Sequence, residues 1–293
     1  MKAFSSFHPI VLVLYFGVVL ITSMFASHPV ILIEALLSGI LLNIMLSERK
    51  NILSDLGFYL FLFIVITLTN PLFSHNGATP LFFLNGNAIT KEALISGLSI
   101  ATLLTGVIYW FKCYSIIMSS DKFLYIFGRT IPKLSLIFSM VLRFLPLFKV
   151  QMRKVGNAQK AMGLYSGDKY MDKVKSQLSV FSVMITWALE NAVETGDSMK
   201  ARGYGLKGKS HYSLFRFKKV DAVMLVVIGV ICIFLVTGLA SSSIKFNYYP
   251  KVDNVKFGIL SVATYISFGV LAFLPFFVEI KEKIKWNYFV SKI

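Results

Sequence analysis

The chain alternates long apolar runs with shorter polar segments, and this pattern predicts six membrane-spanning helices. Each run approaches the roughly 20 apolar residues that an α-helix needs to cross a bilayer. The predicted spans cover residues 10–26, 30–46, 56–73, 93–118, 222–239 and 257–278. Lys2 precedes the first run, as it would in a signal peptide. A second apolar run follows after only three residues, so we interpret the first as an uncleaved span.

Small residues and a turn motif add detail to this pattern. Small side chains recur every four residues in the fourth span, which allows helix backbones to approach closely in lipid; they are Ala93, Gly97, Ala101 and Thr105. We favour packing within this chain over a docking face for another subunit. In the preceding loop, 74–92, the Asn85-Gly86-Asn87 sequence suits a hairpin turn, with an irregular loop as the alternative.

The segment between the fourth and fifth spans is strongly basic. Residues 121–219 hold 18 Lys and Arg residues against 6 Asp and Glu residues, so +12 of the net charge of +16 lies here. Basic segments of membrane proteins remain cytoplasmic. With four spans before this segment and two after it, both termini are then expected in the cytoplasm. The one misfit is the loop 243–256, which is expected outside the cell. It holds three basic residues, Lys245, Lys251 and Lys256, and one acidic residue, Asp253.

Composition supports an all-α integral membrane protein. Hydrophobic residues make up 56 % of the chain, charged residues 15 %, and the mean hydropathy is +0.71. We divide the chain into residues 1–120 with four spans, 121–219 with the cytoplasmic helices, and 220–293 with two spans and a tail. The basic charge would suggest nucleic acid in a soluble protein, but here it fixes topology against the lipid bilayer, and no nucleic acid is expected.

Chemistry-bearing residues are sparse. Cys113 and Cys232 lie in apolar runs and are expected to be free thiols, and Glu34 is the ionisable residue that we place well inside a span. The sequence contains no zinc-protease or nucleophile-elbow motif. We therefore predict no catalytic residue, no metal site and no cofactor bound by this chain.

Two long helices are predicted within the basic segment, at 134–161 and 172–201. Pro146 is expected to kink the first. Ala188, Ala192 and Gly196 share one face of the second helix, which predicts a close crossing of the two. Both helices end in similar sequences, Ala161-Met162-Gly163 and Ala201-Arg202-Gly203, whose glycines are 40 residues apart and suit left-handed helix caps.

These endings resemble those of a known family, the transmembrane T component of energy-coupling factor transporters, of the cobalt-transport-type permeases. The resemblance covers essentially the whole chain. Further matches are Arg143 and Pro146 in Leu142-Arg143-Phe144-Leu145-Pro146, Asp197 before the second ending, and the outer segments Asn70-Pro71-Leu72-Phe73 and Asn85-Gly86-Asn87. Residues 199–204 are the most specific part.

The resemblance implies a scaffold subunit of an importer for vitamins or metal ions. In that family the two endings dock into two ABC-type ATPase subunits, which bind ATP and Mg, while the spans hold a small membrane substrate-binding (S) component. Arg202 would insert into one ATPase, with Ala201 and Gly203 allowing close approach. Ala161, Met162 and Gly163 would form the other contact, although Met162 stands where the family commonly has Arg.

Two alternatives remain open. An intramembrane enzyme that processes lipid or peptide would use Glu190, Asn191 and Glu194 as its active-site groups. A basic adaptor would bind anionic lipid or nucleic acid through residues 121–219, and its binding would depend steeply on salt.

Overall fold

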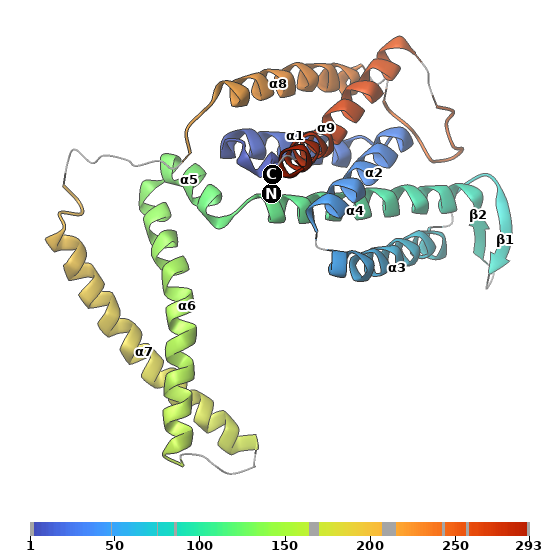
Figure 1. The fold of residues 1–293 in the computed structure, drawn as a ribbon. Helices are drawn as coiled ribbons and strands as arrows, with labels where there is room; N and C mark the ends of the chain where they lie inside the picture. The colour runs from blue at the N-terminus through green and yellow to red at the C-terminus, as the bar shows by residue number, and fades with distance from the viewer. Residues whose placement is uncertain are drawn as a thin grey trace. The chain divides into compact units, whose positions relative to one another are not determined.

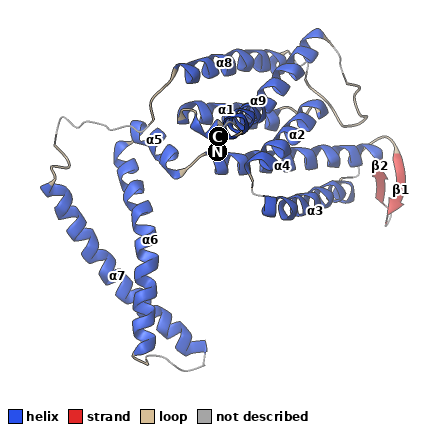
Figure 2. Ribbon diagram, in the orientation of Figure 1, coloured by secondary structure: helices blue, strands red, loops and turns tan. Residues whose placement is uncertain are grey.

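The computed structural model describes residues 3–47, 49–74, 76–84, 87–163, 170–206, 215–241, 244–255 and 258–291. Within them, Figures 1 and 2 show helices throughout, apart from one small strand pair. The prediction of an all-α membrane protein is confirmed. The helices are η1 (Phe4–Ser6), α1 (Pro9–Phe25), α2 (Pro29–Leu46), α3 (Arg49–Phe73), α4 (Lys91–Ile117), α5 (Ser120–Thr130), α6 (Pro132–Ala161), α7 (Tyr170–Ala201), α8 (Lys219–Ala240) and α9 (Ile259–Val290).

The chain divides into two compact units. The first comprises Met1–Phe123 and Phe215–Ile293, and the second comprises Leu124–Leu214. The 11-residue helix α5, which the hydrophobic pattern did not predict, crosses the boundary between them.

Large aromatic residues form the core of the first unit. Tyr15, Phe16, Trp110 and Phe268, from α1, α4 and α9, are fully buried. The indole of Trp110 donates a hydrogen bond to the carbonyl of Ala35 at 2.9 Å, and the Tyr15 hydroxyl donates to the carbonyl of Leu271 at 2.9 Å. Because an unpaired N–H or O–H is costly in an apolar core, these bonds let the aromatic side chains be buried completely.

The small-residue face of α4 packs against α3. Ala93 and Ala101 are completely buried, and a Cβ atom added at Gly97 would lie 2.7 Å from the carbonyl oxygen of Thr67. The Asn70 side chain donates to the carbonyl of Ala93 at 2.8 Å and so secures the same contact. Packing within the chain, the interpretation that we favoured for this face, is confirmed.

Six described helices are long and apolar enough to cross a membrane: α2, Ile52–Phe73 of α3, α4, α6, α8 and α9. Five of them coincide with predicted spans. The predicted first span is the shorter apolar helix α1, with 17 residues. The sixth, α6, lies in the segment where we expected no spanning element, and it qualifies because its N-terminal half is rich in apolar residues. Length and composition alone thus do not distinguish the membrane-spanning helices from a long helix of the basic segment.

The loop 74–92 forms the hairpin that was one of the two alternatives. β1 (Pro80–Leu84) pairs antiparallel with β2 (Asn87–Thr90). The Asn85-Gly86 turn itself lies outside the described residues.

Ionisable residues in the spans differ from the prediction. Besides Glu34, Lys112 of α4 forms an ion pair with Asp55 of α3 and lies over the ring of Tyr59. The two charged residues are 57 positions apart, so only the α3–α4 packing reveals the pair. Cys113 is buried and Cys232 half-buried, and both are free thiols as predicted.

Candidate functional site

The second unit contains the two candidate endings, each at the C-terminus of a long helix. α6 has 30 residues and α7 has 32, and they end at Ala161 and Ala201 as the sequence predicts. α6 continues through Pro146.

A Schellman motif closes α7 at the second ending. Gly203 adopts a φ of 77°, the N–H of Gly203 donates to the carbonyl of Lys200 at 3.0 Å, and the N–H of Tyr204 donates to the carbonyl of Met199 at 3.0 Å. These two bonds satisfy carbonyls that a helix C-terminus otherwise leaves free. The left-handed cap that we expected at Gly203 is confirmed.

The first ending has the same local geometry over its described residues. Gly163 has a φ of 69°, and its N–H donates to the carbonyl of Lys160 at 3.1 Å. Met162 is the capping residue, with a helical backbone. The predicted cap at Gly163 is thus confirmed, and the two endings present the residue before the glycine in the same way.

The side chains that precede each capping glycine project from the surface. Met162 is 66 % exposed, and Ala161, Ala201 and Arg202 are also exposed. Among the described residues, no hydrogen bond or ion pair holds the Arg202 guanidinium. Since the backbone alone closes each helix, Arg202 and Met162 are free to contact another molecule.

The supporting residues of the sequence analysis do not gather around Arg202. Asp197 forms an exposed ion pair with Lys200, with its Oδ1 3.3 Å from the Lys200 Nζ. The Arg143 guanidinium lies 5.7 Å from the ring centroid of Phe144. Arg143 and Pro146 both lie on the exposed surface of α6.

The contact between α6 and α7 lies where the sequence did not predict it. Gln159 is 5 % exposed and donates from Nε2 to the hydroxyl of Ser179 at 2.9 Å. Phe148 and Trp187 pack with their ring centroids 6.0 Å apart. A Cβ atom at Gly196 would meet nothing within 4 Å, so the predicted close crossing at Ala188, Ala192 and Gly196 was wrong. Larger side chains make the contact nearer the α6–α7 connection.

This crossing separates the two endings. Ala161 lies two residues beyond Gln159, whereas Ala201 lies 22 residues beyond Ser179. At about 1.5 Å of rise per residue, the endings are therefore roughly 30 Å apart. They lie at opposite ends of the helix pair, as Figure 1 also shows. A partner that contacts both endings must therefore span roughly 30 Å.

A buried cation fixes the first turn of α5 within the first unit. The Lys122 ammonium donates to the carbonyl and hydroxyl of Ser5, at 2.5 and 2.7 Å, and to the carbonyl of Ile117 at 3.0 Å. Burial lowers the pKa of Lys122 from its ordinary value of 10.5. The pattern of the sequence did not identify this residue, which lies one position before Phe123, the residue at the boundary between the two units.

The residues proposed for an intramembrane enzyme do not form an enclosed site. Glu190 and Glu194 are exposed, and the Asn191 side chain donates to the carbonyl of Trp187 at 3.0 Å. In the described parts of the chain, no group of three His, Cys, Asp or Glu residues is placed to hold a metal ion.

Comparison with known proteins identifies the family. The family model described as CbiQ, cobalt transport protein, matches residues 8–212, which include both glycine-capped endings. The chain belongs to this family. The resemblance to the transmembrane component of energy-coupling factor transporters is thereby confirmed.

Several relatives carry the name energy-coupling factor transporter transmembrane protein EcfT. The protein of Listeria innocua serovar 6a is 27 % identical over 184 residues, or 59 % of this chain and 69 % of the relative. That of Staphylococcus aureus is 27 % identical over 188 residues, or 60 % and 70 %. That of Lacticaseibacillus paracasei is 24 % identical over 230 residues, or 74 % and 87 %.

Proposed function

We propose that this CbiQ-family chain is the T component of an ATP-driven importer and transmits the motion of two ATPase subunits to a separate substrate-binding membrane subunit. One observation carries this proposal. The exposed residues Met162 and Arg202 stand at glycine-capped ends of two long helices, roughly 30 Å apart by the rise per residue. Such spacing suits one contact on each subunit of an ATPase pair.

The helices supply the mechanical link. With 30 and 32 residues, α6 and α7 span about 45 and 48 Å. Each end docks in a groove of one ATPase, and ATP-driven closure of the pair moves the ends relative to each other. The contacts of Gln159 with Ser179 and of Phe148 with Trp187 make the helices respond together.

The nucleotide chemistry belongs to the partners. ATP and Mg bind the two ABC-type ATPases, and this chain supplies neither a catalytic residue nor a bound cofactor. Both termini and residues 121–219 lie in the cytoplasm, where the ATPases are available.

The substrate subunit meets the spans within the plasma membrane. Phe58 and Phe61 of α3 are 61 % and 67 % exposed, and such apolar surface suits lipid or the S component. The substrate class is a vitamin or a metal ion, and the family description, cobalt transport protein, supports the metal ion.

Reconstitution tests this function. The purified chain alone should hydrolyse no ATP, whereas its complex with two ABC-type ATPases and an S component should couple hydrolysis to uptake in liposomes. Turnover of lipid or peptide by the chain alone would support the enzyme alternative instead. Binding of anionic lipid or nucleic acid by the chain alone that vanishes between 50 and 200 mM salt would favour the basic adaptor.

A further inference from the structure

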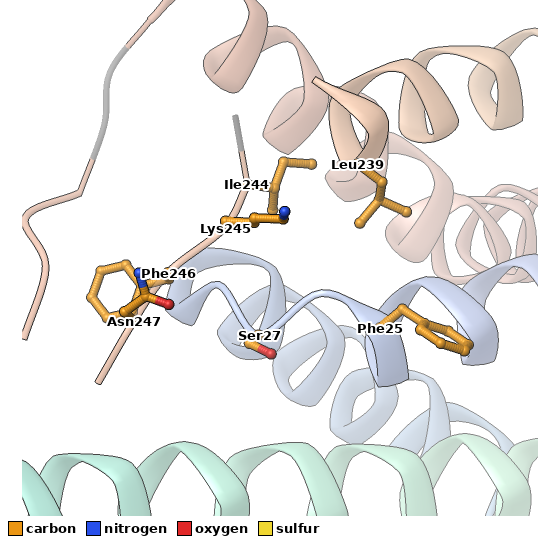
Figure 3. A pocket seen from close by; sticks show the side chains of 7 residues that line it. All are labelled: Phe25, Ser27, Leu239, Ile244, Lys245, Phe246 and Asn247. Carbon is orange, nitrogen blue, oxygen red and sulfur yellow. The ribbon is translucent and has the colours of Figure 1, made fainter. Parts of the chain in front are cut away.

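The outer loop that violates the positive-inside rule lines a pocket in the first unit. The pocket has a volume of about 430 Å³, within the range of small-ligand sites. Its walls come from the end of α1, the end of α8 and the loop that follows α8 (Figure 3); they are Phe25, Ser27, Leu239, Ile244, Lys245, Phe246 and Asn247.

Alternating burial fixes the loop in place and points its polar residues outward. Ile244 and Phe246 are 3 % and 8 % exposed, whereas Lys245 and Asn247 are exposed. Phe246 packs edge-on against His28, with centroids 5.4 Å apart. The hydroxyl of Tyr248 donates to the carbonyl of Ser27 at 2.8 Å, which ties the loop to the end of α1. The pocket is therefore built by specific contacts.

The loop leaves the charge of Lys245 uncompensated. Its acidic residue, Asp253, accepts the N–H of Asn247 at 3.1 Å, and the N–H of Asp253 donates back to the Asn247 carbonyl at 3.1 Å. Among the described residues, no carboxylate pairs with Lys245. In Figure 3 the Lys245 side chain extends toward the side of the pocket where Leu239 and Phe25 lie.

Apolar residues at two helix ends form the other wall of the pocket. Phe25 is the last residue of the apolar helix α1 and is 74 % exposed, and Leu239 lies one residue before the end of the apolar helix α8. The pocket thus combines an ammonium and two polar side chains with apolar residues at the ends of two apolar helices. An anion with an attached acyl chain matches both halves.

We propose that this pocket binds an anionic phospholipid, whose phosphate contacts Lys245, Ser27 and Asn247 and whose acyl chain lies along Phe25 and Leu239. The uncompensated lysine is then a ligand for lipid at the ends of α1 and α8, which explains why a basic residue is placed there. This inference depends on the membrane location of the chain and not on the proposed coupling function.

Native mass spectrometry of the full-length chain in detergent tests the proposal. Dioleoyl phosphatidylglycerol should bind more tightly than dioleoyl phosphatidylcholine, and Lys245→Gln should weaken phosphatidylglycerol binding about fivefold, as expected for one basic residue near anionic lipid. Lys251→Gln is the matched control, since Lys251 is an exposed lysine of the same loop outside the pocket. Phe25→Ala should weaken the binding of both lipids.

Three results would overturn the proposal. Equal losses from Lys245→Gln and Lys251→Gln would reveal diffuse surface charge rather than a site. Equal binding of the two lipids would show that the pocket does not recognise the anionic headgroup. Displacement of the lipid by equimolar glycerol 3-phosphate would show that the acyl chain does not contribute to binding. Size-exclusion profiles that match the unsubstituted chain verify that each variant is folded.

Discussion

The side chain of Gln159 donates a hydrogen bond to the hydroxyl of Ser179 at 2.9 Å, and this bond joins α6 to α7 close to the end of α6. Gln159 is nearly buried, while its Oε1 has no partner among the described residues. The bond therefore links the glycine-capped end of α6 directly to α7, the helix that carries the second ending.

Gln159→Ala should lower the free energy of unfolding by about 1–2 kcal/mol, because it removes this bond and a buried side chain. Gln177→Ala, at an exposed position of α7, is the matched control and should have little effect. Thermal unfolding of the two variants in detergent, followed by circular dichroism, measures the difference. Equal melting temperatures would show that the Gln159 contact does not hold the helices together.

Gly196 inside α7 and Gly203 just after its end should respond to alanine with opposite signs. Gly203→Ala forces a side chain into a φ of 77° and 3.1 Å from Leu206, so it should destabilise the chain by about 1 kcal/mol. Gly196→Ala lies inside the helix with nothing within 4 Å, so it should stabilise by up to about 1 kcal/mol. Melting temperatures test both, and stabilisation by Gly203→Ala would argue against the capped ending.

The caps illustrate what the sequence can predict. Gly163 and Gly203 are local signals, since a helix followed by glycine is closed by bonds within a few residues, and the helix ends at Ala161 and Ala201 followed from them. Five predicted spans coincide with long apolar helices for the same reason, because one stretch of chain contains the whole signal.

Contacts between distant segments could not be predicted in this way. The Asp55–Lys112 pair and the Lys122–Ser5 bonds depend on how helices pack, and no periodicity encodes them. The small residues of α4 and α7 give the same sequence pattern, yet Gly97 contacts α3 closely while Gly196 contacts nothing within 4 Å. Only the partner helix distinguishes the two.

Lys122 predicts a pH dependence of stability. Because burial lowers its pKa in the folded chain, the unfolded chain holds the proton more tightly, and stability rises as pH increases through the window below 10.5. Lys122→Met should lack this gain, whereas Lys133→Met, at an exposed position, should retain it. The comparison requires melting temperatures at pH 7 and pH 10. If the increase in melting temperature between pH 7 and pH 10 persists in Lys122→Met, other groups cause it.

Met162 should contribute to ATPase binding and not to folding. Met162→Ala should weaken binding of one ATPase about tenfold, since burying a methionine side chain contributes about 1.5 kcal/mol or more. Met171→Ala is a closely matched control, because the two methionines are 66 % and 64 % exposed. Affinities of the purified ATPases for the chain in detergent measure both. Equal losses in the two variants, or a changed melting temperature for Met162→Ala, would contradict this role.

The central claim is that Arg202 docks into an ATPase, and the affinity of the Arg202→Ala variant tests it most directly. Truncating one partner of a buried charge pair costs about 2–5 kcal/mol, so binding of the ATPase pair should weaken at least roughly 30-fold and uptake should fall with it. Arg153→Ala removes an equally charged, exposed residue from α6 and should leave both unchanged. Unchanged ATPase affinity together with normal uptake in Arg202→Ala would contradict the coupling role of this helix end.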